Sequence, residues 1–228
     1  MSKTQIQLPT ETWIRATWEE YIQTIEDLSY EKAKSYYHNE KFRIEMSPLG
    51  NEHGRDHAVI IGAIAFFAAT KNIALNAIDN CTYRKTRFRE AQPDVSYYIG
   101  ENADVIPWGT SIIDLDIYPP PTLVIEVANT SLADDKGEKR LLYEALNIAE
   151  YWIVDVQNAE IIAFAVADGG SRKINQSQVL PGLAISLLDE ALQRTRQINQ
   201  TQVYAWLLNQ FEKAEARGKK TEGDPDPS

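Results

Sequence analysis

Hydrophobic positions recur at helical spacing in several parts of the chain. Between Glu52 and Thr70 this spacing predicts one long helix that lies across a sheet. Its expected buried stripe consists of Ile60, Ile61, Ile64, Ala65, Phe67 and Ala68. Thr17 and Glu20 have the spacing of a capping box, which predicts a shorter helix that ends near Leu28.

A second pattern, short runs rich in β-branched and aromatic residues, predicts strands. Lys32–Tyr37 and Lys41–Met46 are expected to form a hairpin around a turn at His38–Glu40, and Ser47–Gly50 then breaks the sheet. Further strand-like segments are Ile73–Ile78, Thr82–Phe88, Pro93–Ile99, Leu123–Ala128, Tyr151–Val156 and Ile161–Val166. Strands that alternate with helices indicate an α/β protein.

A helix predicted at Ala133–Leu146 connects two of these strands. The order strand, helix, strand favours a parallel pair with a right-handed crossover. The expected buried face of this helix consists of Leu141, Leu142, Ala145 and Leu146.

One domain accounts for the length and composition. The chain has 228 residues, of which 43% are hydrophobic, and this content is enough to fill a sizeable core. We expect a single domain over residues 1–217, with a core at about 30–188, a turn at Asp168–Ser171 and closing helices at Leu187–Arg194 and Gln202–Arg217. Residues 218–228 are polar and contain Pro and Gly, so we expect a disordered tail.

Net charge and cysteine content limit which ligands and binding partners the protein can have. A formal charge of -10 repels a polyanion at long range, so binding to nucleic acid requires a local basic patch or metal ions. The single cysteine, Cys81, excludes an intramolecular disulfide and a cysteine zinc site. The longest apolar stretch, Ala58–Thr70, is too short to cross a bilayer, and the start lacks the pattern of a secretory signal. We therefore expect a cytoplasmic protein without a membrane span.

Two carboxylates are candidates for a metal site. Glu126 is the only charged residue in the apolar run Leu123–Ala128, and burying its charge requires a proton, a cationic partner or a metal ion. Asp94 follows Pro93 at the start of another predicted strand, where the alternative is a turn or cap residue. Two oxygen donors on adjacent strands suit magnesium, which keeps several of its waters, and manganese is a plausible substitute.

The residues after Glu126 supply a candidate cation. Asp135, Lys139 and Tyr143 are spaced by four, so they share one face of the crossover helix. Lys139 could then approach a scissile phosphate or the attacking water at the carboxyl end of the Glu126 strand. The alternative is an exposed Asp–Lys pair that contributes only about 0.3–0.5 kcal/mol.

Glu45, His53 and His57 precede the long helix or lie at its start. The His-x-x-x-His spacing can bind zinc, but no glutamate follows the first histidine and no third ligand is evident. We expect His57 to be solvated or to pack against the protein, and either Glu45 or His53 to face the site.

A basic segment lies at residues 84–89. Lys85, Arg87 and Arg89 would share one face of a single extended strand, since side chains alternate with a period of two. They could follow a phosphate backbone, or they could protect an edge strand from aggregation.

As an ordered set, several stretches resemble the Uma-two family of restriction endonucleases, within the PD-(D/E)xK nuclease superfamily. The resemblance spans about residues 30–188. The matching stretches are Glu45–Pro48, Glu52–Gly54, Pro93–Ser96, Leu123–Val127, Asp135–Lys139 with Tyr143, and Glu150–Asp155.

The resemblance implies a restriction-endonuclease-like core, in which helices flank a mixed sheet, with additional N-terminal hairpin strands and C-terminal helices. Asp94 and Glu126 then match the acidic pair of the nuclease motif, and they would bind magnesium together with the Val127 carbonyl. Ala128 stands where the motif has its lysine, and the family pattern suggests that Lys139 replaces it.

The activity implied is that of a magnesium-dependent endodeoxyribonuclease. By analogy with nucleases of this fold, the chain could form a homodimer. Two other functions stay open: a binding or assembly module that keeps the nuclease fold without turnover, and a hydrolase of small phosphate esters.

Overall fold

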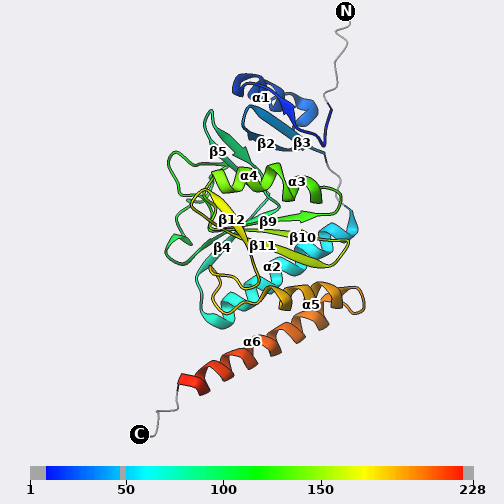
Figure 1. Ribbon diagram of the computed structural model, residues 1–228, viewed down its shortest axis with the longest axis vertical. Coiled ribbons are helices and arrows are strands. Elements are labelled where there is room, and N and C mark those ends of the chain that lie inside the picture. Colours follow the sequence, from blue (N-terminus) through cyan, green and yellow to red (C-terminus); the bar gives the residue numbers. More distant parts are fainter. Residues whose placement is uncertain (1–8, 47–49, 223–228) are drawn as a thin grey trace, which may run out of the picture.

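Two six-stranded sheets organise the structure, a computed structural model that describes residues 9–46 and 50–222 (Figure 1). The first sheet, in the strand order β1-β3-β2-β6-β5-β8, contains β1 (Ile14–Arg15), β2 (Lys34–His38), β3 (Lys41–Glu45), β5 (Thr82–Lys85), β6 (Arg89–Ala91) and β8 (Ile112–Asp114). The second, in the order β12-β11-β10-β9-β7-β4, contains β4 (Leu75–Asp79), β7 (Val95–Ile99), β9 (Leu123–Ala128), β10 (Glu150–Asp155), β11 (Glu160–Ala167) and β12 (Gly170–Ile174).

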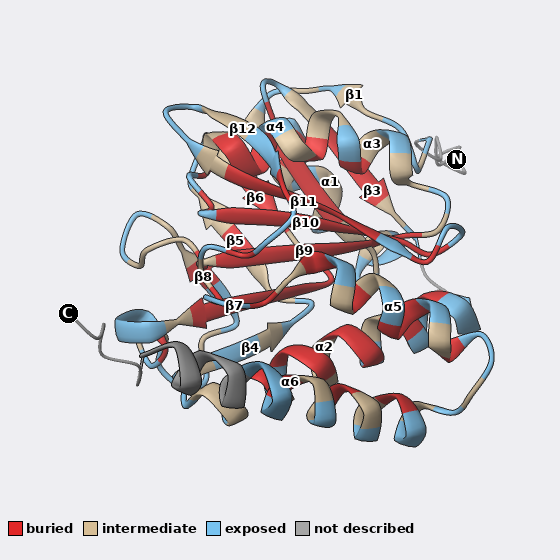
Figure 2. Ribbon diagram, turned by 60° about the horizontal axis from the view of Figure 1, so that its bottom comes forward, coloured by how far each residue is buried: buried red, intermediate tan, exposed pale blue. Residues whose placement is uncertain are grey.

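Helices cover the second sheet on both faces. The α-helices are α1 (Trp18–Ile25), α2 (Asn51–Lys71), α3 (Leu132–Lys136), α4 (Glu138–Ala145), α5 (Ile185–Thr195) and α6 (Gln200–Glu222), and two 3-10 turns are η1 (Leu28–Tyr30) and η2 (Gly100–Asn102). In Figures 1 and 2, α2, α5 and α6 lie on one side of the sheet, and α3 and α4 lie on the other. The predicted α/β class, with helices on both sides of a mixed sheet, is confirmed.

Several helices and strands form where local sequence patterns predict them. Thr17 and Glu20 form the expected capping box at the start of α1. Strands β2 and β3 form the predicted hairpin, which belongs to the first sheet. Strand β9 has the predicted bounds, and it pairs in parallel with β10, as a strand–helix–strand unit requires.

The long helix α2 is confirmed, and its buried stripe packs against the second sheet with α5 and α6 (Figure 2). Ile60, Ile64, Phe67 and Ala68 are buried as expected. Ile61 is only half-buried, and the expected burial of Ala65 is wrong. Ala65 lies about 100° around the helix axis from Ile64, which takes it past the edge of the stripe.

The predicted helix at Ala133–Leu146 is divided into α3 and α4. The break falls at Gly137, whose φ of -104° and ψ of -109° are far from helical values. A Cβ at this position would lie 3.0 Å from the Ala133 carbonyl oxygen, so the close approach favours glycine. Leu141 is 43% exposed, which contradicts its predicted burial, whereas Tyr143 is buried.

The predicted strand Thr82–Phe88 is wrong in its second half. The chain turns at residues 86–88, where Arg87 has a φ of 66°, and it returns as β6. Lys85 pairs directly with Arg89 across this hairpin, and Arg84 forms an ion pair with buried Glu90. The prediction that Lys85, Arg87 and Arg89 share one face of a single strand is therefore wrong.

The C-terminal third also differs from expectation. The turn predicted at Asp168–Ser171 is limited to residues 168–169, because Gly170 already begins β12. Helix α6 continues to Glu222, past the start of the tail predicted at 218, and residues 223–228 lie outside the described part. In the described ranges no helix is long and apolar enough to cross a membrane.

Gly62 lies where α2 meets α6, and a Cβ there would be 2.7 Å from the Tyr204 ring. We expect Gly62→Ala to destabilise the fold by about 1–3 kcal/mol, since Tyr204 must leave its contact with Phe66 and its hydrogen bond to the Ala58 carbonyl. Urea unfolding measures the free energy.

Gly54 offers a matched control on the same helix, because a Cβ there meets no atom within 4 Å. Gly54→Ala should stabilise the protein by up to about 1 kcal/mol through helix propensity. In a Tyr204→Ala background Gly62→Ala should also become stabilising. An unchanged penalty in that background would show that the steric explanation is wrong.

Candidate active site

Strand pairing brings the two predicted metal carboxylates together. Strands β7 and β9 are antiparallel neighbours, with Val95 opposite Ile125. Continuing this register by one residue places Asp94 opposite Glu126. Residues opposed in this way project from the same face, with Cβ atoms about 4.5–5.5 Å apart.

Alternation along β9 decides which face that is. Leu123, Ile125 and Val127 belong to the core beneath α2, whereas Val124 and Ala128 belong to the core beside α4. Glu126 therefore lies on the α4 side of the sheet, where the first sheet also packs.

Asp94 is held by contacts from three directions. Its Oδ2 accepts a hydrogen bond of 2.7 Å from the Val127 main-chain N–H, and its Oδ1 forms an ion pair with Lys34. His53 Nε2 lies 3.5 Å from the same Oδ1. Burial alone would raise the pKa of Asp94, but the nearby His53 and the charge of Lys34 hold this pKa well below its usual range. Asp94 is therefore ionised.

Glu126 is 2% exposed and has a different environment. Its Oε1 accepts a hydrogen bond of 2.6 Å from the Tyr143 hydroxyl, and its Oε2 accepts one of 3.4 Å from the Tyr36 hydroxyl. Burial, together with the negative charges of Asp94 and Asp135, raises the pKa of Glu126 to about 8, although Lys139 opposes the shift. A nearby cation would reverse this shift.

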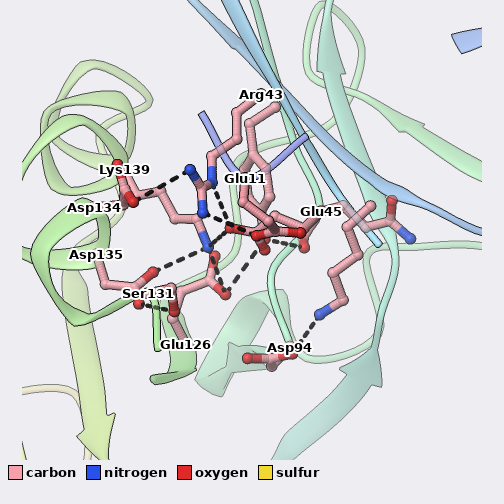
Figure 3. A network of polar contacts seen from close by, with 12 residues as sticks. Glu11, Arg43, Glu45, Asp94, Glu126, Ser131, Asp134, Asp135 and Lys139 are labelled. Atoms are coloured by element: carbon pink, nitrogen blue, oxygen red, sulfur yellow. Dashed lines mark hydrogen bonds and ion pairs between the residues drawn. The ribbon is translucent and has the colours of Figure 1, made fainter. Parts of the chain in front are cut away.

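Lys139 is enclosed by carboxylates, as Figure 3 shows. Its ammonium lies 2.9 Å from Glu45 Oε1, 3.0 Å from Asp135 Oδ1 and 3.7 Å from Glu126 Oε2. Burial favours the neutral amine, but these three charges raise the pKa of Lys139 well above its ordinary value. Asp135 and Lys139 are both buried, so the alternative of an exposed surface pair is wrong.

Arg43 extends the network to the chain that precedes α1. Its guanidinium is 2.7 Å from Glu45, 3.1 Å from Glu11 and 3.2 Å from Asp134 (Figure 3). Glu45 therefore joins Arg43 and Lys139, and their positive charges lower its pKa despite burial. The hairpin β2–β3 is thus part of the site.

These side chains surround a pocket of about 320 Å³. Its lining includes the predicted residues Glu45, His53, Asp94, Glu126, Val127 and Lys139. Within residues 9–46 and 50–222, no group of three His, Cys, Asp or Glu side chains could hold a metal ion by itself. A metal site here would use two carboxylates and waters, which is the usual coordination of magnesium.

Other predicted residues lie away from the pocket. His57 is half-buried, with Nε2 3.3 Å from Asp79, and its ring centroid is 6.1 Å from that of His53. Lys85 lies 3.8 Å from Asp116, on the β5–β6 hairpin. Among the described residues that line the pocket, none is Lys85, Arg87 or Arg89.

Lys34, Tyr36 and Arg43 are site residues that sequence reasoning missed. Lys34 and Tyr36 are two residues apart on β2, so they share one face of the hairpin. The sequence signal that could have identified them is the presence of charged residues within a predicted hairpin rich in aromatic residues. Their partners Asp94 and Glu126 are 60 and 90 residues away in the chain, and only the packing of the two sheets identifies them.

Comparison with protein-family models identifies the family of this chain. The Uma2 model, described as "Putative restriction endonuclease", matches residues 18–201. The chain belongs to the Uma2 family. This match confirms the resemblance inferred from the ordered motifs. The matched range contains all of the site residues described above except Glu11.

A solved structure and the curated proteins add little to this assignment. The chain is similar to a crystal structure described as "a putative nuclease belonging to DUF820" from Anabaena variabilis. The identity is 16%, the TM-score is 0.49, and the match covers 84% of this chain and 98% of that chain. Among curated proteins, none matches the Uma2 chain.

The raised pKa of Glu126 predicts a pH-dependent stability. Because the folded state favours the protonated form, the stabilisation is complete below pH 4.5 and is lost as the pH rises through about 8. Without metal, Glu126→Gln should remove this loss and gain on the order of a few kcal/mol over wild type at pH 9. Unfolding in EDTA across pH 5–9 measures it. Parallel curves for both proteins would contradict the prediction.

Proposed function

We propose that this Uma2 protein is a metal-dependent endonuclease that hydrolyses phosphodiester bonds in DNA. The observation that carries the proposal is the pair of carboxylates Asp94, just before β7, and Glu126, on the neighbouring strand β9, which line one pocket together with Lys34 and Lys139. The family description favours a nucleic-acid substrate. This combination supports a nuclease more strongly than a binding module, because Glu126 is a costly residue to bury without a catalytic or ligand role.

The donor set fits magnesium, with manganese as a substitute. Asp94 is ionised, and Glu126 would be held as a carboxylate by a bound cation in place of its proton. Val127 lines the same pocket, and its carbonyl is the proposed third protein ligand. When bound, such an ion lowers the pKa of a coordinated water and stabilises negative charge on a phosphate.

The surrounding side chains would hold the two carboxylates in place. The Tyr143 and Tyr36 hydroxyls donate to Glu126, and the Val127 N–H donates to Asp94. We propose that Lys139 neutralises charge beside Glu126 in place of the motif's lysine, since its ammonium lies 3.7 Å from Glu126 Oε2. Glu45 and Asp135 in turn fix Lys139.

Contacts outside the pocket would bring nucleic acid to a protein of net charge -10. The β5–β6 hairpin, with Lys85, Arg87 and Arg89, is the proposed phosphate-binding element. Its Lys85 and Arg89 lie directly opposite each other and therefore share a face. A homodimer would supply two such hairpins to one duplex.

Loss of either metal carboxylate should abolish cleavage. Asp94→Asn and Glu126→Gln should each lower the rate of magnesium-dependent cleavage of plasmid DNA by at least about a hundredfold, because both remove a proposed metal ligand. Cleavage assays and calorimetric titration with manganese measure the two losses together.

Asp79→Asn is the matched control. This carboxylate ends β4, the neighbour of β7, and its side chain is 61% exposed. It should keep both cleavage and manganese binding. Undiminished cleavage by Asp94→Asn or Glu126→Gln would refute the site. Hydrolysis of small phosphate esters but not of oligonucleotides would refute the substrate class.

A further inference from the structure

The pocket contains two lysines in unlike surroundings. Lys139 has a side chain that is 2% exposed, and it has Glu45, Asp135 and Glu126 within 4 Å. Its ammonium also lies 4.3 Å from the centre of the Tyr36 ring. An ammonium has three donors, so contact with a substrate would cost Lys139 a buried ion pair.

Lys34 is held much less tightly. Its side chain is 15% exposed and lines the pocket, and Asp94 Oδ1 is its ion-pair partner. Its strand β2 belongs to the first sheet, whereas Asp94 directly precedes β7 of the second, so the ammonium bridges the sheets.

The position of this ion pair matters because Asp94 is also a proposed metal ligand. Its Oδ2 already accepts the hydrogen bond from Val127. A divalent ion bound at either oxygen of Asp94 would lie close to the Lys34 ammonium, and burial strengthens the repulsion between the two cations.

We propose that Lys34 is a built-in counter-ion that a metal ion displaces from Asp94, and that the freed ammonium then binds a phosphate of the substrate. This inference rests on the proposed function. It assigns Lys34 as the substrate-binding cation and Lys139 as a positioning residue. The consequence is a pair of opposite effects: Lys34 weakens metal binding alone and strengthens nucleic-acid binding in the presence of metal.

The first test is calorimetric titration of the full chain with manganese, without nucleic acid. Lys34→Gln and Lys34→Met should each bind manganese about tenfold more tightly than wild type, because the competing charge is gone. Lys34→Arg keeps the charge and should stay within about twofold of wild type.

Lys41→Gln is the matched control. Lys41 lies on the other strand of the same hairpin, pairs with Glu138 at 3.0 Å and is absent from the pocket lining in the described part. It removes the same charge, yet manganese affinity should change by less than about twofold, because the distant charge is screened.

The second test measures binding of a phosphorothioate oligonucleotide, which resists cleavage, in saturating manganese. Fluorescence anisotropy should give an affinity about tenfold weaker for Lys34→Gln, because a charge-assisted contact to phosphate is lost. Lys34→Arg should restore most of it. A merely structural Lys34 would change both affinities in the same direction, and thermal unfolding would reveal a general loss of structure.

The outcomes separate this inference from the proposed function. If wild type binds manganese and cleaves DNA but Lys34→Gln binds manganese no more tightly, the counter-ion role is overturned and the nuclease assignment stands. If wild type binds no manganese, both are overturned. Tighter manganese binding with unchanged oligonucleotide binding overturns the phosphate contact.

Discussion

Charge neutralisation at a buried junction between two sheets is the constraint on which this structure depends. Glu45, Asp94, Glu126 and Asp135 are buried or nearly so, Arg43 and Lys139 are buried with them, and Lys34 is partly buried. Leaving one of these charges unpaired would cost several kcal/mol. The hairpin β2–β3 and helix α4 must therefore pack where they do, because they carry the cations.

The same junction is the basis of the proposed divalent-cation site. The neutralisation is incomplete, and the imbalance falls on Glu126, whose pKa is raised although Lys139 lies beside it. Asp94 stays ionised next to Lys34 and His53. Glu126 is not fully neutralised, and the neighbouring Asp94 is paired with Lys34, which itself lines the pocket. This arrangement favours binding of a further cation.

The errors in the sequence interpretation have a common cause. Local rules gave correct strands at Leu123–Ala128 and in the β2–β3 hairpin, where period and turn residues agree. They failed at residues 84–89, because strongly β-favouring residues continue through a turn that the pairing with β6 and β8 decides. They also failed at Gly137, where a single glycine divides a helix whose pattern continues on both sides.

The sequence by itself determined most elements, the family and the pair Asp94 and Glu126. Periodicity encodes elements locally, and a lone carboxylate in an apolar strand is visible without coordinates. Only the tertiary structure decided that Lys34 neutralises Asp94, that Arg43 and Lys139 share Glu45, and that the basic hairpin lies away from the pocket. These contacts join residues as far as 94 positions apart, from Glu45 to Lys139, and such pairs depend on how two sheets pack, which no local pattern records.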